Sequence, residues 1–196
     1  MSQSSKEFIL TTLKTNKPAE VPLPEIDLSI VLNYEDLTSQ FCEVLQKIGG
    51  YFKLFNSLDE ILKDIKNESI NGFNINTFNL SDAEKKDLYQ KSSYELEALD
   101  KTYIRGELGV AENGAIWINE NTLPNRIIPF ICQHLIIVLD AKNIVSTLHE
   151  AYNRLSFDNL GFGAFIAGPS KTADIEQSLV VGAHGARSLT VYLYNC

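Results

Sequence analysis

The feature that most constrains the fold of this chain is a pair of apolar runs near its C-terminus with a polar segment between them. The apolar runs are residues 162–167 and 189–194, and short apolar runs bounded by turn residues are typical of buried strands. The segment between them, residues 168–185, begins with Gly-Pro-Ser-Lys-Thr, continues in a helical pattern and ends in Gly-Ala-His-Gly. The sequence therefore predicts a strand–turn–helix–strand unit whose polar residues gather at one strand end, where open α/β sheets bind their ligands.

Helical and strand-like patterns alternate along the rest of the chain. Apolar residues at helical spacing predict helices at residues 6–14, 36–48, 57–65, 81–88 and 140–155. Apolar runs predict strands at residues 51–55, 103–111, 115–118 and 127–138. This order predicts an α/β protein, an open sheet with helices on its faces, together with a small, mainly helical N-terminal part.

Prolines interrupt the chain near its start. Pro18, Pro22 and Pro24 break both helices and central strands, so residues 1–33 are predicted to form an N-terminal tail. Residues 34–196 are long enough for one α/β domain with a sizeable core. Within that domain, we expect residues 34–100 to be a less regular helical part and residues 101–196 to form the core.

Composition and charge argue against several classes of function. The formal net charge is -8 and the pI is about 4.9, so the surface repels phosphate backbones and nucleic acid is not an expected partner. No apolar stretch is long enough to span a bilayer, and the polar first residues lack the apolar centre of a signal peptide. We therefore expect a cytoplasmic protein without a membrane span.

Cysteine spacing limits which metals the chain can hold. Cys42, Cys132 and Cys196 are far apart and no Cys-x-x-Cys pair occurs. We therefore expect no metal site and no iron–sulfur cluster held by this chain alone. The dinucleotide-binding pattern Gly-x-Gly-x-x-Gly is also absent, so we expect the chain to bind no cofactor by itself.

The first turn of the 168–185 segment carries the residue types of an anion site. Gly168, Ser170, Lys171 and Thr172 supply a glycine turn, two hydroxyls and one ammonium group. A helix that begins at Ser170 or Thr172 would add free backbone N–H groups to the same place. The alternative is that one of the two hydroxyls only caps the helix and that Lys171 is solvated.

Three titratable residues follow in the same segment. Asp174 and Glu176 fall in the first turn of the predicted helix, where they would partly offset a bound anion. They would instead favour a ligand with a positive or donating group, or Asp174 would orient Lys171 or His184. His184, followed by Gly185, is a candidate for proton transfer. The alternative is that its ring only holds the turn through hydrogen bonds to the backbone.

A second candidate site is the Glu112-Asn113-Gly114 turn between two predicted strands. A carboxylate at a strand end can act as a nucleophile or a base, and Gly114 would let a substrate approach the backbone closely. The alternative is that Asn-Gly forms a two-residue hairpin turn and that Glu112 merely faces solvent.

The order Gly-Pro-Ser-Lys-Thr-Ala-Asp-Ile-Glu, an apolar run and then Gly-Ala-His-Gly resembles the C-terminal motif of the LUD domain, the family of lactate utilization protein C. Ala186 stands where that family usually has proline. The resemblance implies a fold like that of ribose-5-phosphate isomerase, glucosamine-6-phosphate deaminase and the CoA-transferases. The Glu-Asn-Gly turn looks like the one that carries the catalytic glutamate in the CoA-transferases, although LUD members commonly have Thr-Gly or Ser-Gly there.

The resemblance also implies a function. Members of the family act with two partner proteins in oxidising L-lactate to pyruvate, so this chain would supply a pocket for a small carboxylate, acyl or phosphate ligand, or a docking surface, beside iron–sulfur partners. Two alternatives stay open: an independent enzyme that acts on a CoA or sugar-phosphate substrate through Glu112, and a non-catalytic subunit that stabilises a complex. Homo-oligomer formation is compatible with all three.

Overall fold

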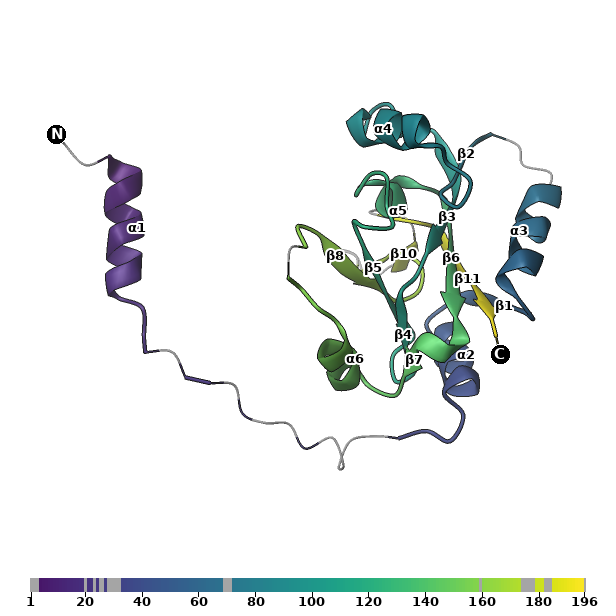
Figure 1. Cartoon of the computed structure of the whole chain (residues 1–196), viewed down its shortest axis with the longest axis horizontal. Helices are drawn as coiled ribbons and strands as arrows, with labels where there is room; N and C mark the ends of the chain where they lie inside the picture. The colour runs from purple at the N-terminus through teal and green to yellow at the C-terminus, as the bar shows by residue number, and fades with distance from the viewer. Residues whose placement is uncertain are drawn as a thin grey trace. The chain divides into compact units, whose positions relative to one another are not determined.

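The computed structural model describes residues 4–195 with gaps at 20, 23, 25–26, 28–32, 69–71, 159, 174–178 and 182–184, and gives only the backbone at 172–173 and 179–181 (Figure 1). Contacts divide the chain into two compact units, Met1–Ile30 and Val31–Cys196. The first unit contains helix α1 (Ser5–Thr15), which begins with a capping box formed by Ser4 and Glu7 and buries none of its residues. Among the described residues, no helix has the length and apolar character needed to cross a membrane.

A five-stranded parallel sheet forms the centre of the second unit. Its strands follow the order β1-β11-β6-β3-β2. Their bounds are β1 Tyr51–Phe55, β11 Ser188–Tyr194, β6 His134–Asp140, β3 Leu99–Arg105 and β2 Phe73–Asn76. Both edge strands come from residues 34–100, so this part of the chain belongs to the sheet as well as contributing helices.

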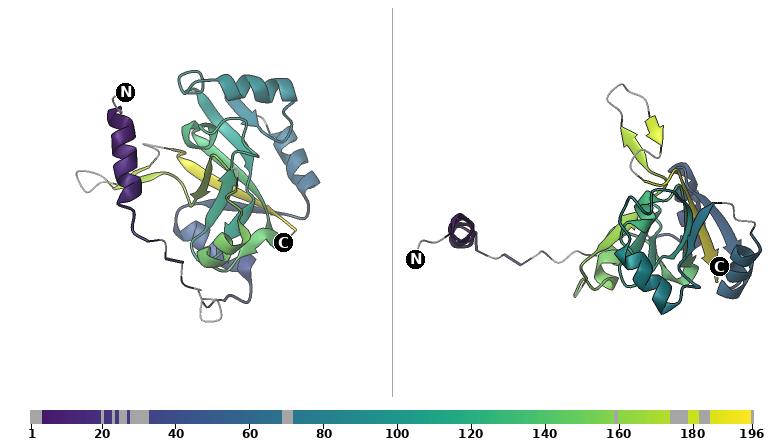
Figure 2. Two further views of the ribbon diagram at one scale, coloured as in Figure 1. Left: turned by 60° about the vertical axis from the view of Figure 1, so that its left-hand side comes forward. Right: turned by 90° about the horizontal axis from the view of Figure 1, so that it is seen from above.

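A second sheet of four strands packs against the first. Its order is β7-β4-β5-β8, with β4 parallel to β7 and antiparallel to β5, and with β5 antiparallel to β8. The bounds are β7 Ile144–Val145, β4 Leu108–Val110, β5 Ala115–Asn119 and β8 Gly163–Ile166. The remaining two strands, β9 (Lys171–Ala173) and β10 (Leu179–Val181), form an antiparallel pair that projects from the two sheets (Figure 2).

The helices begin where polar caps occur in the sequence. Side chains of Asp36, Ser57, Ser81 and Thr147 accept hydrogen bonds from backbone N–H groups at the starts of four helices, which stabilises groups without partners inside a helix. The helices of the second unit are α2 Leu37–Lys47, α3 Leu58–Asn67, α4 Asp82–Gln90, α5 Ile128–Ile131 and α6 Leu148–Arg154, with a 3-10 turn at Ala141–Asn143.

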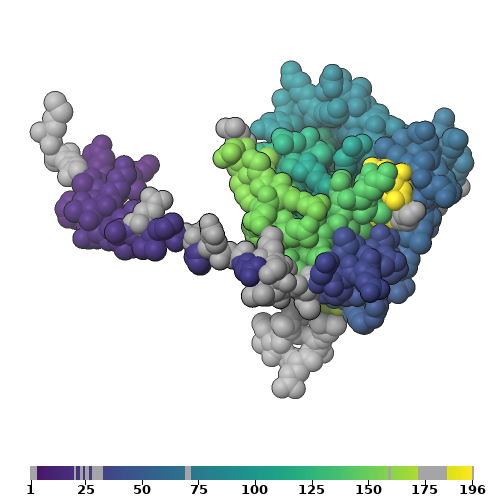
Figure 3. All heavy atoms as spheres, turned by 60° about the horizontal axis from the view of Figure 1, so that its bottom comes forward, coloured from purple at the N-terminus to yellow at the C-terminus, as the bar shows by residue number. Residues whose placement is uncertain are grey.

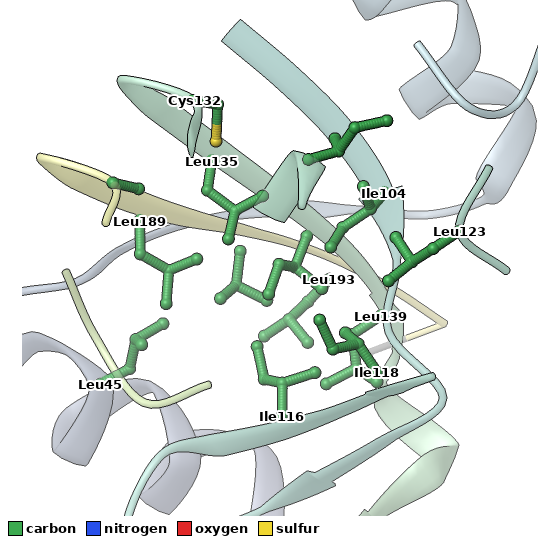
Figure 4. Packing of buried hydrophobic residues seen from close by; sticks show 14 of the residues in the cluster. Leu45, Ile104, Ile116, Ile118, Leu123, Cys132, Leu135, Leu139, Leu189 and Leu193 are labelled. Carbon is green, nitrogen blue, oxygen red and sulfur yellow. The ribbon is translucent and has the colours of Figure 1, made fainter. Parts of the chain in front are cut away.

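Side chains alternate between the two faces along the central strands, so each face of the parallel sheet packs against a different layer. Leu135, Ile137 and Leu139 of β6 pack in one cluster with Ile116 and Ile118 of the second sheet (Figure 4). On the other face, Ile136 and Val138 pack with Ile61 and Ile65 of α3. Because successive side chains of a strand point to opposite faces, a continuous apolar run fills two cores at once. The α/β class predicted from the sequence is thus confirmed.

Several predicted elements are divided in the structure. The run at 127–138 contains the short helix α5, which has Pro129 in its first turn, and only then β6; a proline there lacks the N–H that a central strand needs. The predicted helix at 140–155 is a 3-10 turn, the strand β7 and the short α6. The predicted strand at 103–111 ends at Arg105 and resumes as β4.

Gly106 explains where the predicted strand at 103–111 divides. A Cβ atom at this position would lie 2.6 Å from Cγ2 of Ile116 and 2.8 Å from Cγ2 of Ile137, which belong to the two sheets. The chain therefore passes from one sheet into the other at a point where only a glycine fits between them.

The predicted helix of the 168–185 segment is wrong where the structure describes it. Residues 171–173 and 179–181 form the β9–β10 pair, in which Lys171 is opposite Val181 and Ala173 is opposite Leu179. Residues 174–178 lie outside the described residues. The apolar run Leu-Val-Val pairs with a neighbouring strand, and such pairing overrides a weak helical pattern because short helices need tertiary packing to be stable.

Candidate functional site

The carboxyl end of α2 is the point at which both predicted sites meet. A Cβ atom on Gly114 would lie 3.1 Å from Cδ1 of Ile48, and one on Gly168 would lie 3.4 Å from the same atom. Two turns that are far apart in the sequence therefore pack against a single residue. In the space-filling view, α2 forms the indigo surface beside the green surface of residues near β7, which it contacts (Figure 3).

Gly168 has a backbone conformation that favours glycine. Its φ angle is +74°, and a Cβ atom at this position would lie 3.0 Å from the carbonyl oxygen of Ile48. Both the left-handed conformation and the close approach to a backbone atom exclude larger residues. The glycine thereby brings the first turn of the 168–185 segment against the end of α2.

Lys171 is anchored at the same helix end. Its Nζ donates a hydrogen bond of 2.5 Å to the carbonyl oxygen of Ile48, which follows the last residue of α2. A cation at this position is stabilised because the carboxyl end of a helix carries partial negative charge. Lys171 remains exposed, and an ammonium group has three N–H donors, so two are left for a ligand.

Ser170 and Gly185 lie side by side. The backbone N–H of Ser170 donates to the carbonyl oxygen of Ala186 at 2.9 Å, which holds the two ends of the 168–185 segment together. A Cβ atom on Gly185 would lie 3.1 Å from Cβ and 3.3 Å from Oγ of Ser170. The absence of a side chain at Gly185 therefore keeps the Ser170 hydroxyl accessible.

These residues border a cavity of about 320 Å³. Its polar contribution comes from Ser170, Lys171 and the backbone of Gly168 and Gly185, while the rest of its wall is largely apolar. The apolar wall consists of Pro129, Phe130, Leu135, Phe165, Ile166, Ala167, Pro169, Ala186 and Leu189. A small apolar pocket with a few convergent polar groups is the usual form of a small-molecule site.

The cavity lies near the amino ends of two central strands. Leu135 and Leu189 are the second residues of β6 and β11, and both border the cavity. Ligands of open α/β sheets usually bind outside the carboxyl ends of the strands. The structure therefore places the 168–185 turn at the opposite end of the parallel sheet from the position that this general rule favours.

Glu112 makes a structural contact away from the cavity. Its Oε1 accepts a hydrogen bond of 2.6 Å from the backbone N–H of Leu148, the first residue of α6, and its own N–H donates to the carbonyl oxygen of Ser146. The turn is a four-residue connection between β4 and β5 rather than a two-residue Asn-Gly hairpin, and Gly114 ends it with a φ angle of +69°. Glu112 thus caps α6, and it does not border the cavity of the 168–185 segment.

We expect Glu112→Ala to lower the free energy of unfolding by about 1–3 kcal/mol, because the Leu148 N–H loses a charged acceptor at a helix start. Chemical denaturation measures this loss. Glu43→Ala is the matched control, since its carboxylate joins only an exposed i,i+4 pair with Lys47 and such pairs contribute little. Equal stability of both variants would contradict the capping role.

Several predicted site residues lie outside what the structure describes. Asp174, Glu176 and His184 belong to its gaps, and for Thr172 only the backbone is described, as part of β9. The structure thus unites Gly168, Ser170, Lys171 and Gly185 with the cavity and separates Glu112 from it. Ile48 was not predicted to matter, although the Gly-Gly pair that follows it indicates a helix end on which another turn can pack.

The buried Cys132 is not a reactive thiol. Cys132 is 1% exposed, and burial raises the pKa of its thiol to about 12, so it is neutral at pH 7. Cys42 is also buried, and neither thiol is in a disulfide. Within the described part of the chain, no group of three or more histidine, cysteine, aspartate or glutamate side chains is placed to hold a metal ion.

Two packed sheets with α3 outside one and α6 outside the other, and a Gly-Pro-Ser-Lys turn that packs against the end of α2, define the class as an α/β protein with a cavity at the amino ends of its parallel strands. The family model of the LUD domain matches residues 57–194 of the 196 in the chain. The chain belongs to the LUD domain family.

Two curated relatives share part of their sequence with this chain. A lactate utilization protein C from Oceanobacillus iheyensis is 26% identical over 90 residues, 43% of this chain and 39% of the relative. A lactate utilization protein C from Bacillus pumilus is 34% identical over 82 residues, 39% of this chain and 34% of the relative. The matched segments thus span less than half of these relatives.

A solved structure supports the fold. The crystal structure of a DUF162 family protein from Deinococcus radiodurans superposes with a TM-score of 0.57 and 17% sequence identity. The match covers 84% of this chain and 100% of that chain. Likeness at this level of identity concerns the fold alone.

Proposed function

We propose that this chain acts in lactate utilization, as the LUD-domain subunit of a system that oxidises L-lactate to pyruvate, and that it binds a small organic anion in the cavity of the 168–185 segment. The names of the two curated relatives support the lactate role. The family resemblance implies that iron–sulfur partner proteins carry the electrons in this proposal, and the three scattered cysteines of the chain, which form no Cys-x-x-Cys pair, agree with that division. The expected location is the cytoplasm.

The observation that carries the proposed anion site is the meeting of Ser170 and Lys171 at one cavity of about 320 Å³. A volume of this size falls at the lower end of the range of small-molecule pockets. The apolar wall excludes water from one side of a ligand, and this strengthens the interaction of its carboxylate with an ammonium group. A short carboxylate or acyl group fits this combination of one cation, one hydroxyl and apolar side chains.

A ligand can bind Lys171 without breaking the hydrogen bond between Lys171 and the end of α2. The bond to the Ile48 carbonyl uses one N–H of the ammonium group, and a ligand carboxylate can accept from the other two. The helix end then serves to position the lysine, which lowers the entropy cost of ordering its long side chain when the ligand binds. No observed contact favours the alternative of an independent enzyme that uses Glu112, because that carboxylate caps α6.

We expect L-lactate, pyruvate or an acyl compound to raise the unfolding free energy of the chain by about 2.7 kcal/mol at a hundredfold excess over its Kd. Differential scanning fluorimetry across L-lactate, pyruvate, free CoA, acyl-CoA and sugar phosphates identifies the class. Ser170→Ala and Lys171→Ala should each raise the Kd for the ligand at least about tenfold, since each removes a donor to the ligand.

The matched control is Lys142→Ala, which removes an exposed lysine from the 3-10 turn at Ala141–Asn143. Its response should equal that of the unmodified chain. Unchanged affinity in Lys171→Ala would refute the anion site. A lack of response to every compound, together with normal assembly with partner proteins, would instead support a non-catalytic subunit that stabilises a complex.

A further inference from the structure

A second cavity lies away from the 168–185 segment, on the β2 edge of the parallel sheet. It has a volume of about 490 Å³ and is bordered by α4, by the loop that follows β2, by the loop that follows β5 and by Arg105, the last residue of β3. Figure 1 shows α4 beside β2 at this edge. The cavity thus lies where β2 and β3 end, which is the usual ligand position in an open α/β sheet.

Three cations border this cavity, although the chain as a whole is acidic. Lys85 and Lys86 come from α4 and Arg105 from β3, and no carboxylate is among the bordering residues. Lys85 forms a pair of 3.6 Å with Asp82, which is fully exposed to solvent and therefore adds little. Lys86 and Arg105 form no ion pair with any residue that the structure describes, although Glu107 lies within electrostatic range of Arg105.

The same cavity offers flat apolar surfaces. The guanidinium group of Arg105 lies over the ring of Phe78, 5.6 Å from its centre. Tyr89 is 76% exposed on α4, next to the two lysines in the helix, and it borders the cavity together with Leu80 and Leu123. An exposed aromatic ring beside three cations suits a ligand with a flat ring and several negative charges.

The two threonine hydroxyls at the cavity already donate hydrogen bonds within the chain. The hydroxyl of Thr77 donates to the carbonyl oxygen of Tyr103 at 3.0 Å, and that of Thr122 donates to the carbonyl oxygen of Asn119 at 3.2 Å. These bonds stabilise the loops after β2 and β5. The three cations, the rings and the amide side chain of Asn121 are the groups at the cavity that can contact a ligand.

We propose that this cavity is a binding site for a nucleoside phosphate, in which Lys85, Lys86 and Arg105 contact the phosphate groups and Tyr89 stacks on the base. Phosphates are favoured over a single carboxylate because three cations at one cavity match two or more negative charges. The site is separate from the proposed anion site, which lies near the amino ends of β6 and β11, so either can exist without the other.

Isothermal titration of the full chain with ADP tests the proposal. In a double variant, Lys86→Gln with Arg105→Gln, the Kd should rise at least about tenfold, since two charged donors are lost. Tyr89→Ala should raise the Kd for ADP and leave the Kd for pyrophosphate unchanged. Lys63→Gln, which removes one exposed charge from α3, is the matched control and should bind as the unmodified chain does.

Three outcomes would overturn the proposal. They are the absence of ADP binding at about millimolar concentration, an unchanged Kd in the double variant, and equal Kd values for ADP and pyrophosphate. A Kd for ADP that rises with salt concentration would support contact with the phosphates, because screening weakens interactions at exposed cations. Thermal unfolding of each variant confirms that it is folded, which is expected because all the substituted side chains are exposed.

Discussion

Replacing Gly168 with alanine is expected to destabilise the protein and to impair the cavity of the 168–185 segment together. A residue with a side chain at φ +74° costs about 1–2 kcal/mol, and the added Cβ would also press on the Ile48 carbonyl oxygen at 3.0 Å. That carbonyl accepts the hydrogen bond of Lys171, so a shift of the turn also moves the lysine. Urea denaturation measures the loss of unfolding free energy.

Gly72→Ala separates the cost of the left-handed conformation from the cost of the contact with the Ile48 carbonyl oxygen. Gly72 has a φ angle of +90°, but among the described residues a Cβ atom there would meet nothing closer than the Cβ of Asp100, at 3.6 Å, which is an ordinary contact. This variant should therefore lose only the conformational term of about 1–2 kcal/mol. A larger loss for Gly168→Ala, with weaker ligand binding, is the expected result, and equal losses at the two positions would contradict the role given to the Ile48 contact.

Replacing Ile137 with alanine is expected to cause one of the largest losses of stability, about 2–5 kcal/mol. The side chain is 0% exposed and lies in the core between the two sheets, where Ile116 and Leu139 surround it. Neither sheet can move toward the cavity that the substitution leaves without breaking its own strand pairing, so the gap would stay largely empty. Chemical denaturation of the variant provides the measurement.

Leu54→Ala is the matched control for this substitution. Leu54 lies on the edge strand β1 and is 56% exposed, so its truncation should change the unfolding free energy by less than about 1 kcal/mol. A loss under 1 kcal/mol in Ile137→Ala would show that the two sheets repack easily. The core between the two sheets would then contribute little to the stability of the fold.

Local sequence patterns predicted well those elements whose stability is local. The helices α2, α3 and α4 begin after Asp36, Ser57 and Ser81, and each cap is recognisable in the sequence because a short polar side chain precedes an apolar period. The strands β1, β5, β8 and β11 lie within one or two residues of their predicted bounds, since short apolar runs between turns leave few other structures.

The predictions of the divided elements were wrong for a different reason. Residues 127–138 contain an apolar run and residues 140–155 a helical pattern, and neither pattern shows where one element ends and the next begins. Gly106 marks the passage from β3 to β4, and Pro129 marks the short helix before β6, but glycine and proline are each also tolerated inside other structures. The pairing of 171–173 with 179–181 likewise depends on a partner strand rather than on helical periodicity.

Part of the candidate site was predictable from residue types. Gly168, Ser170 and Lys171 were identified because glycine, hydroxyl and ammonium groups in one turn suit an anion, and the structure brings them to one cavity. The cluster of Lys85, Lys86 and Arg105 was not predicted, because its members come from a helix and a strand that meet only in the folded chain. Glu112 was given a chemical role that its contact with the start of α6 does not support.

The sequence by itself determined the α/β class, the starts of α2, α3 and α4, and the family, since periodicity, caps and a contiguous motif all depend on neighbouring residues. The tertiary structure alone decided that one apolar run fills two cores, that Lys171 anchors on Ile48, and that three cations share one cavity. The physical reason is distance along the chain. These contacts join residues that are far apart in the sequence, and the free energy that fixes them comes from burial and pairing in the assembled fold.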